Sequence, residues 1–260
     1  MQRISLLLPT LLVALPVFAQ VPAHPIEART AAGHPMHYLV SLPIGWNSQR
    51  QWPAVVVIPD AYRHFEEATR DFSAARGDRP FVIVTPLVLG GGGTAQQHMD
   101  DFDYSQAVWA RIATEGNCKF DEDGLSSVLS DVHQRFHTDD KVFMTGWEAG
   151  GHVVLAQLLN HPERIRAVAV STPNFAGRCV NDLVPARDPV NLGIPVRMFH
   201  GSLDSAGTAQ GTPLNSQWRR FDALARSRGY TDLRDVEAPN RGHGSLSEEV
   251  MAWFATLTKP

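Results

Sequence analysis

The sequence lacks several features that would assign its 260 residues to a well-defined functional class. It has no block of lysines or arginines, and its formal net charge is −4, so it offers no basic surface for nucleic acid. Four consecutive glycines at 90–93 are not followed by GK[ST], which favours a flexible loop over a phosphate loop. After the N-terminal segment, no run is apolar enough to span a bilayer as a helix of about 20 residues. We therefore expect neither a nucleic acid nor a membrane partner for the mature chain.

Residues 1–19 have the pattern of a secretory signal peptide. Arg3 precedes an apolar stretch at 6–18, which is too short for a membrane anchor, and a small-residue cleavage signal ends at Ala19. With 43% hydrophobic residues, the remaining chain is able to bury one sizeable core. We expect one domain over 20–260, in a secreted or periplasmic protein, and the sequence does not fix its oligomeric state.

The chain has only two cysteines, Cys118 and Cys179. Export would place them in an oxidising compartment, where disulfides form and persist. We expect a disulfide between them. Two independent buried thiols are the alternative, because pairing cannot be read from sequence.

The distribution of apolar residues predicts alternating strands and helices. Strands are expected at 36–42, 54–58, 81–85, 141–145, 166–171, 195–200 and 233–237, and helices at 64–76, 123–136, 149–160, 216–228 and 246–257. Several of the strands are apolar without alternation, as expected when helices cover both faces of a parallel sheet. The predicted fold is a doubly wound, mostly parallel α/β sheet. Two stretches interrupt the alternation: 87–120, which contains a short helical piece at about 107–112, and 172–193. We expect no separate lid domain.

One short segment has the layout of a strand-to-helix turn that presents a reactive side chain. The strand at 141–145 leads into Gly146, Trp147, Glu148, Ala149 and Gly150, and a helical pattern follows. A G-x-S-x-G turn holds its central residue at an unfavourable backbone geometry, and glycines remove the side chains that would collide around it. Here glutamate occupies the position of the serine.

Reactive residues follow several of the predicted strands, where ligands bind in open α/β sheets. Asp60 follows the strand at 54–58, Glu148 the strand at 141–145, Asp204 the strand at 195–200, and His243 the last strand. The chain order of nucleophile position, acid and histidine is that of the α/β-hydrolase triad. It differs from the order in other triad folds.

The run FDEDGLSSVLSDVHQRFHTDDKVFMTGWEAGGH and the later FHGSLD and GHG carry a family resemblance. Over 53–254 the chain resembles the α/β-hydrolases of the secreted polyhydroxybutyrate depolymerase, feruloyl esterase and acetyl xylan esterase type. The resemblance implies that Asp204 is the acid, that His243 is the base, and that Glu148 occupies the nucleophile position. It also implies a small-molecule or polymeric ester-type substrate and no cofactor.

The chain departs from this family pattern at the predicted oxyanion hole as well. Pro59 and Asp60 stand where such esterases usually carry His-Gly, and the backbone amides of Ala61 and Ala149 are the candidate donors, with Tyr62 as the alternative to Ala61. Aromatic residues near the predicted site are candidate walls of a substrate pocket: Tyr62, Phe102, Tyr104, Trp147 and Phe175.

Glutamate at this turn changes the chemistry that the site is able to perform. A carboxylate is already ionised at neutral pH and needs no activating base, and beside His243 it would form an ion pair that favours the charged imidazole. Its attack on an ester would give a mixed anhydride, an improbable intermediate. The carboxylate could instead fill the oxyanion hole by accepting from the amides of Ala61 and Ala149. A metal site of Glu148, Asp60, Asp204 and His243 is a further alternative, but no ligand spacing specifies it and we expect no metal.

Two functional hypotheses remain. In the first, Glu148, His243 and Asp204 form a modified triad with altered or weak hydrolase activity. In the second, the protein is catalytically silent and binds a small molecule, polymer or partner in the same cleft.

Overall fold

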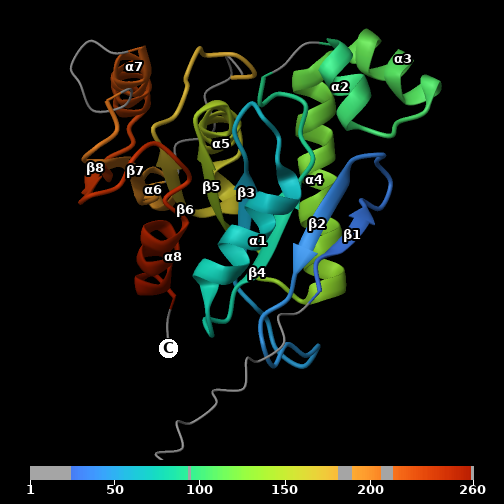
Figure 1. Cartoon of the computed structure of the whole chain (residues 1–260), viewed down its shortest axis with the longest axis horizontal. Coiled ribbons are helices and arrows are strands. Elements are labelled where there is room, and N and C mark those ends of the chain that lie inside the picture. Colours follow the sequence, from blue (N-terminus) through green and yellow to red (C-terminus); the bar gives the residue numbers. More distant parts are fainter. Residues whose placement is uncertain (1–24, 93–94, 181–188, 206–212, 259–260) are drawn as a thin grey trace, which may run out of the picture.

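The computed structural model describes residues 25–92, 95–180, 189–205 and 213–258. The predicted signal peptide lies outside these residues. The described chain forms one eight-stranded sheet in the order β1-β2-β4-β3-β5-β6-β7-β8 (Figure 1). The strands are β1 (Glu27–Thr30), β2 (His37–Ser41), β3 (Ala54–Ile58), β4 (Val82–Pro86), β5 (Val142–Trp147), β6 (Ile165–Ser171), β7 (Val196–Gly201) and β8 (Leu233–Ala238). Only the pairs β1–β2 and β2–β4 are antiparallel, so the predicted mostly parallel sheet is confirmed.

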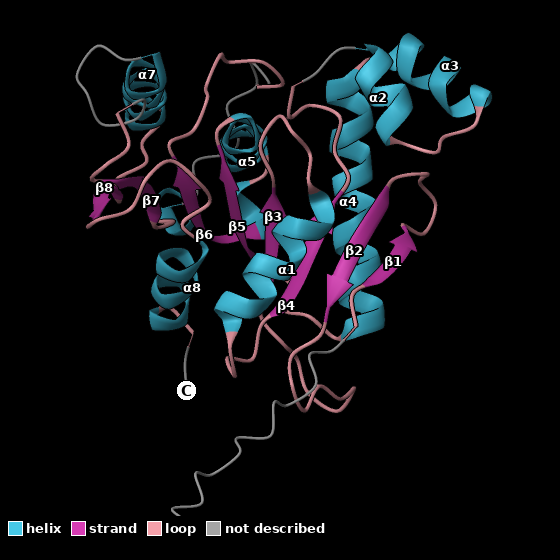
Figure 2. Ribbon diagram, in the orientation of Figure 1, coloured by secondary structure: helices cyan, strands magenta, loops and turns pink. Residues whose placement is uncertain are grey.

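Helices pack on both faces of this sheet (Figure 2). They are α1 (Phe65–Arg76), α2 (Ala95–Asp101), α3 (Gln106–Glu115), α4 (Asn117–Phe136), α5 (Ala149–Asn160), α6 (Pro189–Leu192), α7 (Pro213–Ser227) and α8 (Ser247–Thr256), with a 3-10 turn at Pro162–Arg164. On one face, apolar residues of α1 and α8 pack on the sheet in one buried cluster. On the other face, α4, α5 and α7 pack on the sheet in a second and larger cluster.

The alternation of side chains along the central strands explains these two layers. In β3 all five residues are buried, with Val55 and Val57 in the α1–α8 cluster and Val56 and Ile58 in the other. A strand covered on both faces has no solvent side, so it carries no polar alternation. This is why the sequence shows the strand as a continuous apolar run.

The parallel strands β3, β5, β7 and β8 end at the same edge of the sheet. β3 pairs with β5 in a register that sets Ile58 opposite Gly146, which brings the loop after β3 beside the turn after β5. β7 pairs with β8 up to Gly201 and Ala238, so the loops carrying Asp204 and His243 start side by side. The topology thus gathers the reactive residues named from sequence at one edge.

Among the helices of the described residues, none combines the length and apolar character needed to traverse a lipid bilayer.

Candidate active site

Glu148 lies at the apex of a strained turn between β5 and α5. Its backbone has φ 47° and ψ −119°, a conformation that residues other than glycine rarely adopt. Its amide donates to the carbonyl of Ser171 at 3.1 Å, and its own carbonyl accepts from the amides of Asn174 at 2.8 Å and Gly151 at 3.1 Å. Three backbone hydrogen bonds therefore hold the residue in this geometry.

Asp204 and His243 form a hydrogen-bonded acid–imidazole pair. Nδ1 of His243 lies 2.9 Å from Oδ2 of Asp204, and the same oxygen accepts from the hydroxyl of Thr172 at 2.9 Å. The Asp204 residue is only 2% exposed, whereas the His243 side chain is 41% exposed. A buried carboxylate that holds one ring nitrogen leaves the other nitrogen free for proton transfer. Thr172 was not identified from sequence, because a single threonine after a strand carries no distinguishing pattern.

The Glu148 side chain makes neither contact that the sequence suggested. It is half-buried, and among the described residues no hydrogen bond or ion pair joins its carboxylate to His243. Among the described residues, the amides of Ala61 and Ala149 likewise make no hydrogen bond to this carboxylate. Neither the ion pair with His243 nor a plugged oxyanion hole is therefore seen among the described residues.

The structure selects between the two candidate donors after β3. The Tyr62 amide donates to Oδ1 of Asp60 at 3.1 Å, and the Arg63 amide donates to the Asp60 carbonyl at 3.1 Å. The first bond occupies the Tyr62 amide, whereas the Ala61 amide donates to no acceptor among the described residues. Ala61 and Ala149 flank Gly92, since a Cβ placed on this glycine would lie 3.6 Å and 3.8 Å from their Cβ atoms.

Among the aromatic residues predicted to contact substrate, three are buried residues of the hydrophobic core. Phe102 and Tyr104 are 2% and 8% exposed and stack on each other at 5.5 Å between ring centroids, and Phe175 is 1% exposed and packs on Phe221 at 5.1 Å. Their aromatic rings belong to the larger of the two buried clusters. Trp147 is half-buried against Phe72, and Tyr62, at 76% exposed, is open to solvent.

The turn beside Ala61 and Ala149 is held by two charged residues that sequence analysis did not single out. The carboxylate of Asp121, in the N-terminal part of α4, accepts from the amide of Leu89 at 2.8 Å and from the amide of Gly90. Arg63 donates to the carbonyl of Gly92 and to Oδ2 of Asp101 at 2.7 Å. The glycine run expected to be flexible is thus anchored over its described part.

Burial raises the pKa of Asp121 to about 7, in spite of the two amides that favour its charged form. A carboxyl whose pKa is higher in the folded than in the unfolded chain stabilises the fold most below the unfolded pKa of 3.8, and this stabilisation is lost as the pH rises through the folded pKa. We expect the unfolding free energy of the wild type, measured by urea denaturation relative to Asp121→Asn, to fall between pH 4 and 7 by roughly 1 kcal/mol or more. A difference that stayed constant or rose over this range would contradict the burial effect.

Cys118 and Cys179 form a disulfide with a Cα–Cα distance of 5.1 Å. It joins the first turn of α4 to the loop after β6 across 61 positions of sequence. The Asn174 amide of this loop donates to the carbonyl of Glu148, which lies in the strand-to-helix turn at 146–150, hereafter the elbow. The crosslink therefore ties a loop that contacts Glu148 to the helix that carries Asp121.

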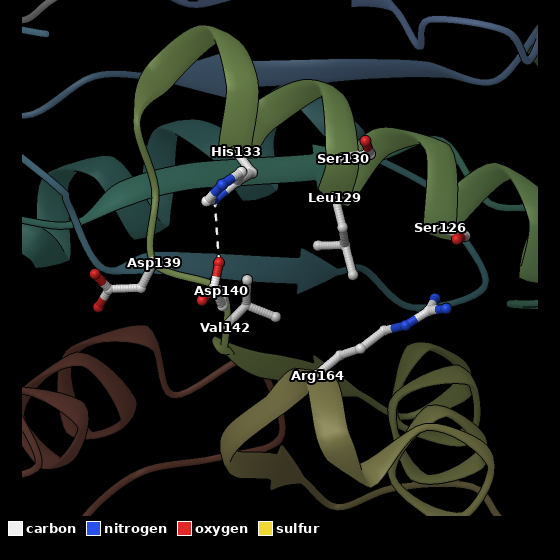
Figure 3. Close-up of a pocket in the computed structure, with 8 residues that line it drawn as sticks. All are labelled: Ser126, Leu129, Ser130, His133, Asp139, Asp140, Val142 and Arg164. Atoms are coloured by element: carbon white, nitrogen blue, oxygen red, sulfur yellow. Dashed lines mark ion pairs between the residues drawn. The ribbon is translucent and has the colours of Figure 1, made fainter.

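A groove of about 280 Å³ lies at the other edge of the sheet, next to the start of β5 and β6 (Figure 3). In it His133 and Asp140 face each other, with Nδ1 3.7 Å from Oδ1, and Arg164 extends from below. Its lining is Ser126, Leu129, Ser130, His133, Asp139, Asp140, Val142 and Arg164. Because these residues precede the strands, the groove is separate from the elbow.

In the part of the chain that the structure describes, no group of three or more histidine, cysteine or carboxylate side chains is arranged to hold a metal, so the four-residue metal site considered from sequence does not form there.

Comparisons with known proteins agree with this architecture. A sequence comparison with curated proteins finds no significant match. Similar solved structures include poly(aspartic acid) hydrolase-1 from Sphingomonas sp. KT-1, with a TM-score of 0.59 and 13% identity over 90% of this chain and 97% of that one. They also include a putative dienelactone hydrolase from Klebsiella pneumoniae, with a TM-score of 0.57 and 17% identity over 90% and 98%. A third is the poly(3-hydroxybutyrate) depolymerase LpqC from Bordetella parapertussis, with a TM-score of 0.51 and 19% identity over 90% and 89%.

At these identities the solved structures establish the α/β-hydrolase fold alone. The family model of the dienelactone hydrolases matches residues 43–221, which include the elbow and Asp204. The chain belongs to the dienelactone hydrolase family.

Proposed function

We propose that this protein is an ester hydrolase with a modified Glu148–His243–Asp204 site and weak or altered activity. The observation that carries the proposal is the His243–Asp204 pair, hydrogen-bonded at 2.9 Å at the same sheet edge as the strained elbow. A histidine that serves only a structural role in a loop does not require a hydrogen bond from its ring to a buried carboxylate. The assembled pair favours catalysis over a purely structural role.

The proposed nucleophile is water rather than the Glu148 carboxylate. His243 accepts a proton from water through the ring nitrogen that Asp204 does not hold, and the water oxygen forms a bond to the ester carbonyl carbon. The amides of Ala61 and Ala149 donate to the resulting oxyanion. When the intermediate collapses, the bond to the leaving oxygen breaks and His243 returns its proton to that oxygen, which gives an acid and an alcohol. Glu148 accepts a hydrogen bond from the attacking water and orients it.

The test is hydrolysis of p-nitrophenyl acetate by the purified protein and two variants. We expect His243→Ala to lower kcat/KM by roughly 100-fold or more, as for loss of a general base, and Glu148→Gln to lower it less. A serine-directed fluorophosphonate should leave residue 148 of the wild type unlabelled. If the wild type is no faster than His243→Ala on p-nitrophenyl acetate and on longer-chain esters, the hydrolase proposal fails.

A second candidate function is binding without catalysis in the same cleft. The observation in its favour is that Glu148 does not contact His243, whereas a working triad couples these two positions. A silent protein would keep the fold and the acid–imidazole pair as inherited features. Equal ester hydrolysis by wild type and His243→Ala would support this function.

We also propose that the protein is exported. The exported state would allow the Cys118–Cys179 disulfide to persist, since reducing compartments keep thiols free. Processing at about position 20, seen by mass spectrometry of the protein from its native host, would test this.

A further inference from the structure

A second cavity lies away from the elbow, between α2, α3 and the start of α4. It has a volume of about 520 Å³ and is lined by His98, Met99, Trp109, Ile112, Ala113, Gly116 and Asn117. In Figure 1 the helices α2 and α3 lie together beside the first turns of α4. Most of these lining residues are apolar, and the volume is in the range of small-molecule sites.

His98 is a buried polar residue of this lining, and no hydrogen bond among the described residues involves its imidazole. The residue is 5% exposed, and its unpaired Nδ1 is fully enclosed by protein atoms, so Nε2 is the ring nitrogen that a molecule in the cavity is able to reach. A bound molecule that hydrogen-bonds Nε2 would give the imidazole a polar partner that the described residues do not supply.

The charge state of His98 limits the chemistry of such a molecule. Burial, and then the positive charge of Arg63, lower the pKa of His98. The imidazole is therefore neutral at neutral pH, with one donor and one acceptor nitrogen. No lysine or arginine lines the cavity, so an anionic ligand would lose its hydration there without gaining a cation.

We propose that this cavity binds a neutral, mainly aromatic small molecule that carries one hydrogen-bonding group. The half-buried indole of Trp109 and the side chain of Ile112 supply the apolar surface, and His98 supplies the polar contact. The Met99 side chain, in a residue 52% exposed, lies at the rim. This site is separate from the proposed ester-hydrolysing centre and does not depend on its activity.

The cavity is connected to the elbow region through one ion pair. Asp101, three residues after His98 in α2, pairs with Arg63 at 2.7 Å, and Arg63 also donates to the carbonyl of Gly92 beside Ala61 and Ala149. A ligand that orders α2 would therefore also order the loop that carries the Ala61 amide. Binding in the cavity would in this way affect the sheet edge that carries Ala61 and Ala149.

The experiment is isothermal titration calorimetry of the purified protein with 1-naphthol and with 1-naphthoate at neutral pH. We expect one site for 1-naphthol and at least tenfold weaker binding of the charged 1-naphthoate. His98→Phe, which keeps an aromatic ring but loses both nitrogens, should weaken 1-naphthol binding about five- to tenfold, the effect of one hydrogen bond. Met99→Glu should weaken it about tenfold or more, because it places a charge at the rim.

Ile44→Ser is the matched control, since Ile44 is a comparably exposed apolar residue, at 50%, that does not line the cavity. It should bind 1-naphthol as the wild type does. Because Met99 is exposed, Met99→Glu folds even if the buried His98 variant does not, and thermal melting checks both. The proposal is overturned if 1-naphthol does not bind, if 1-naphthoate binds equally well, or if Met99→Glu leaves the affinity unchanged. None of these results bears on whether His243 is required for ester hydrolysis.

Discussion

Replacement of Glu148 by serine is expected to raise kcat/KM for p-nitrophenyl acetate by about 100-fold or more over the wild type. The elbow already holds residue 148 at φ 47° through three backbone hydrogen bonds, and Asp204 already holds Nδ1 of His243. The variant needs only a hydroxyl at the apex for His243 to deprotonate, with the amides of Ala61 and Ala149 as oxyanion donors. An acyl-enzyme through Ser replaces attack by water, and a fluorophosphonate should then label position 148.

Two controls separate a new nucleophile from simple removal of a charge. Glu148→Ala removes the same carboxylate without adding a hydroxyl and should show neither the gain nor the labelling. Addition of His243→Ala to the serine variant should abolish most of the gain. If Glu148→Ser is no faster than Glu148→Ala and stays unlabelled, the imidazole is not directed at the apex, and the site is not a triad with one residue exchanged.

The central part of the fold was predictable because its pattern is local. β3 and α5 have the predicted bounds. The apolar run of β3 and the segment between Glu148 and His161 each mark clearly where the element begins and ends. The other predicted strands and helices are all present, with ends shifted mainly by one to three residues, and α4 starts six positions earlier than expected. The order of the reactive residues then follows from parallel strands ending at one edge.

The parts that sequence could not predict depend on contacts made by the folded chain. β1 has four residues, none of them buried, and exists through its antiparallel pairing with β2. A short helical piece was expected at 107–112, but the full length of α3 was not, because this helix buries Ile112 alone and is stabilised by packing beside α4. The roles of Asp121, Arg63 and Thr172 come from side chains that meet across 29 or more positions of sequence. The absence of an ion pair between Glu148 and His243 among the described residues also has no sequence signal.

The second large effect concerns the fold of the elbow rather than its chemistry. In Gly150→Ala the new Cβ would lie 2.2 Å from the carbonyl oxygens of both Ile58 and Pro59. These atoms belong to the end of the buried central strand β3 and to the residue after it, so neither is able to move away as a flexible side chain would. We expect the substitution to lower the unfolding free energy by about 3 kcal/mol or more, measured by urea denaturation, or to prevent folding.

Gly242→Ala is the matched control, because a Cβ at that glycine meets no atom within 4 Å and its backbone is not in the left-handed region. It should change stability by less than about 0.5 kcal/mol. A Gly150→Ala protein as stable as Gly242→Ala would mean that β3 and α5 are further apart than described. Their close approach is what forces residue 148 into its turn, whichever side chain it carries. The elbow is therefore required by the packing of α5 against β3 and persists without a serine, so an intact elbow is by itself no evidence that residue 148 acts as a nucleophile.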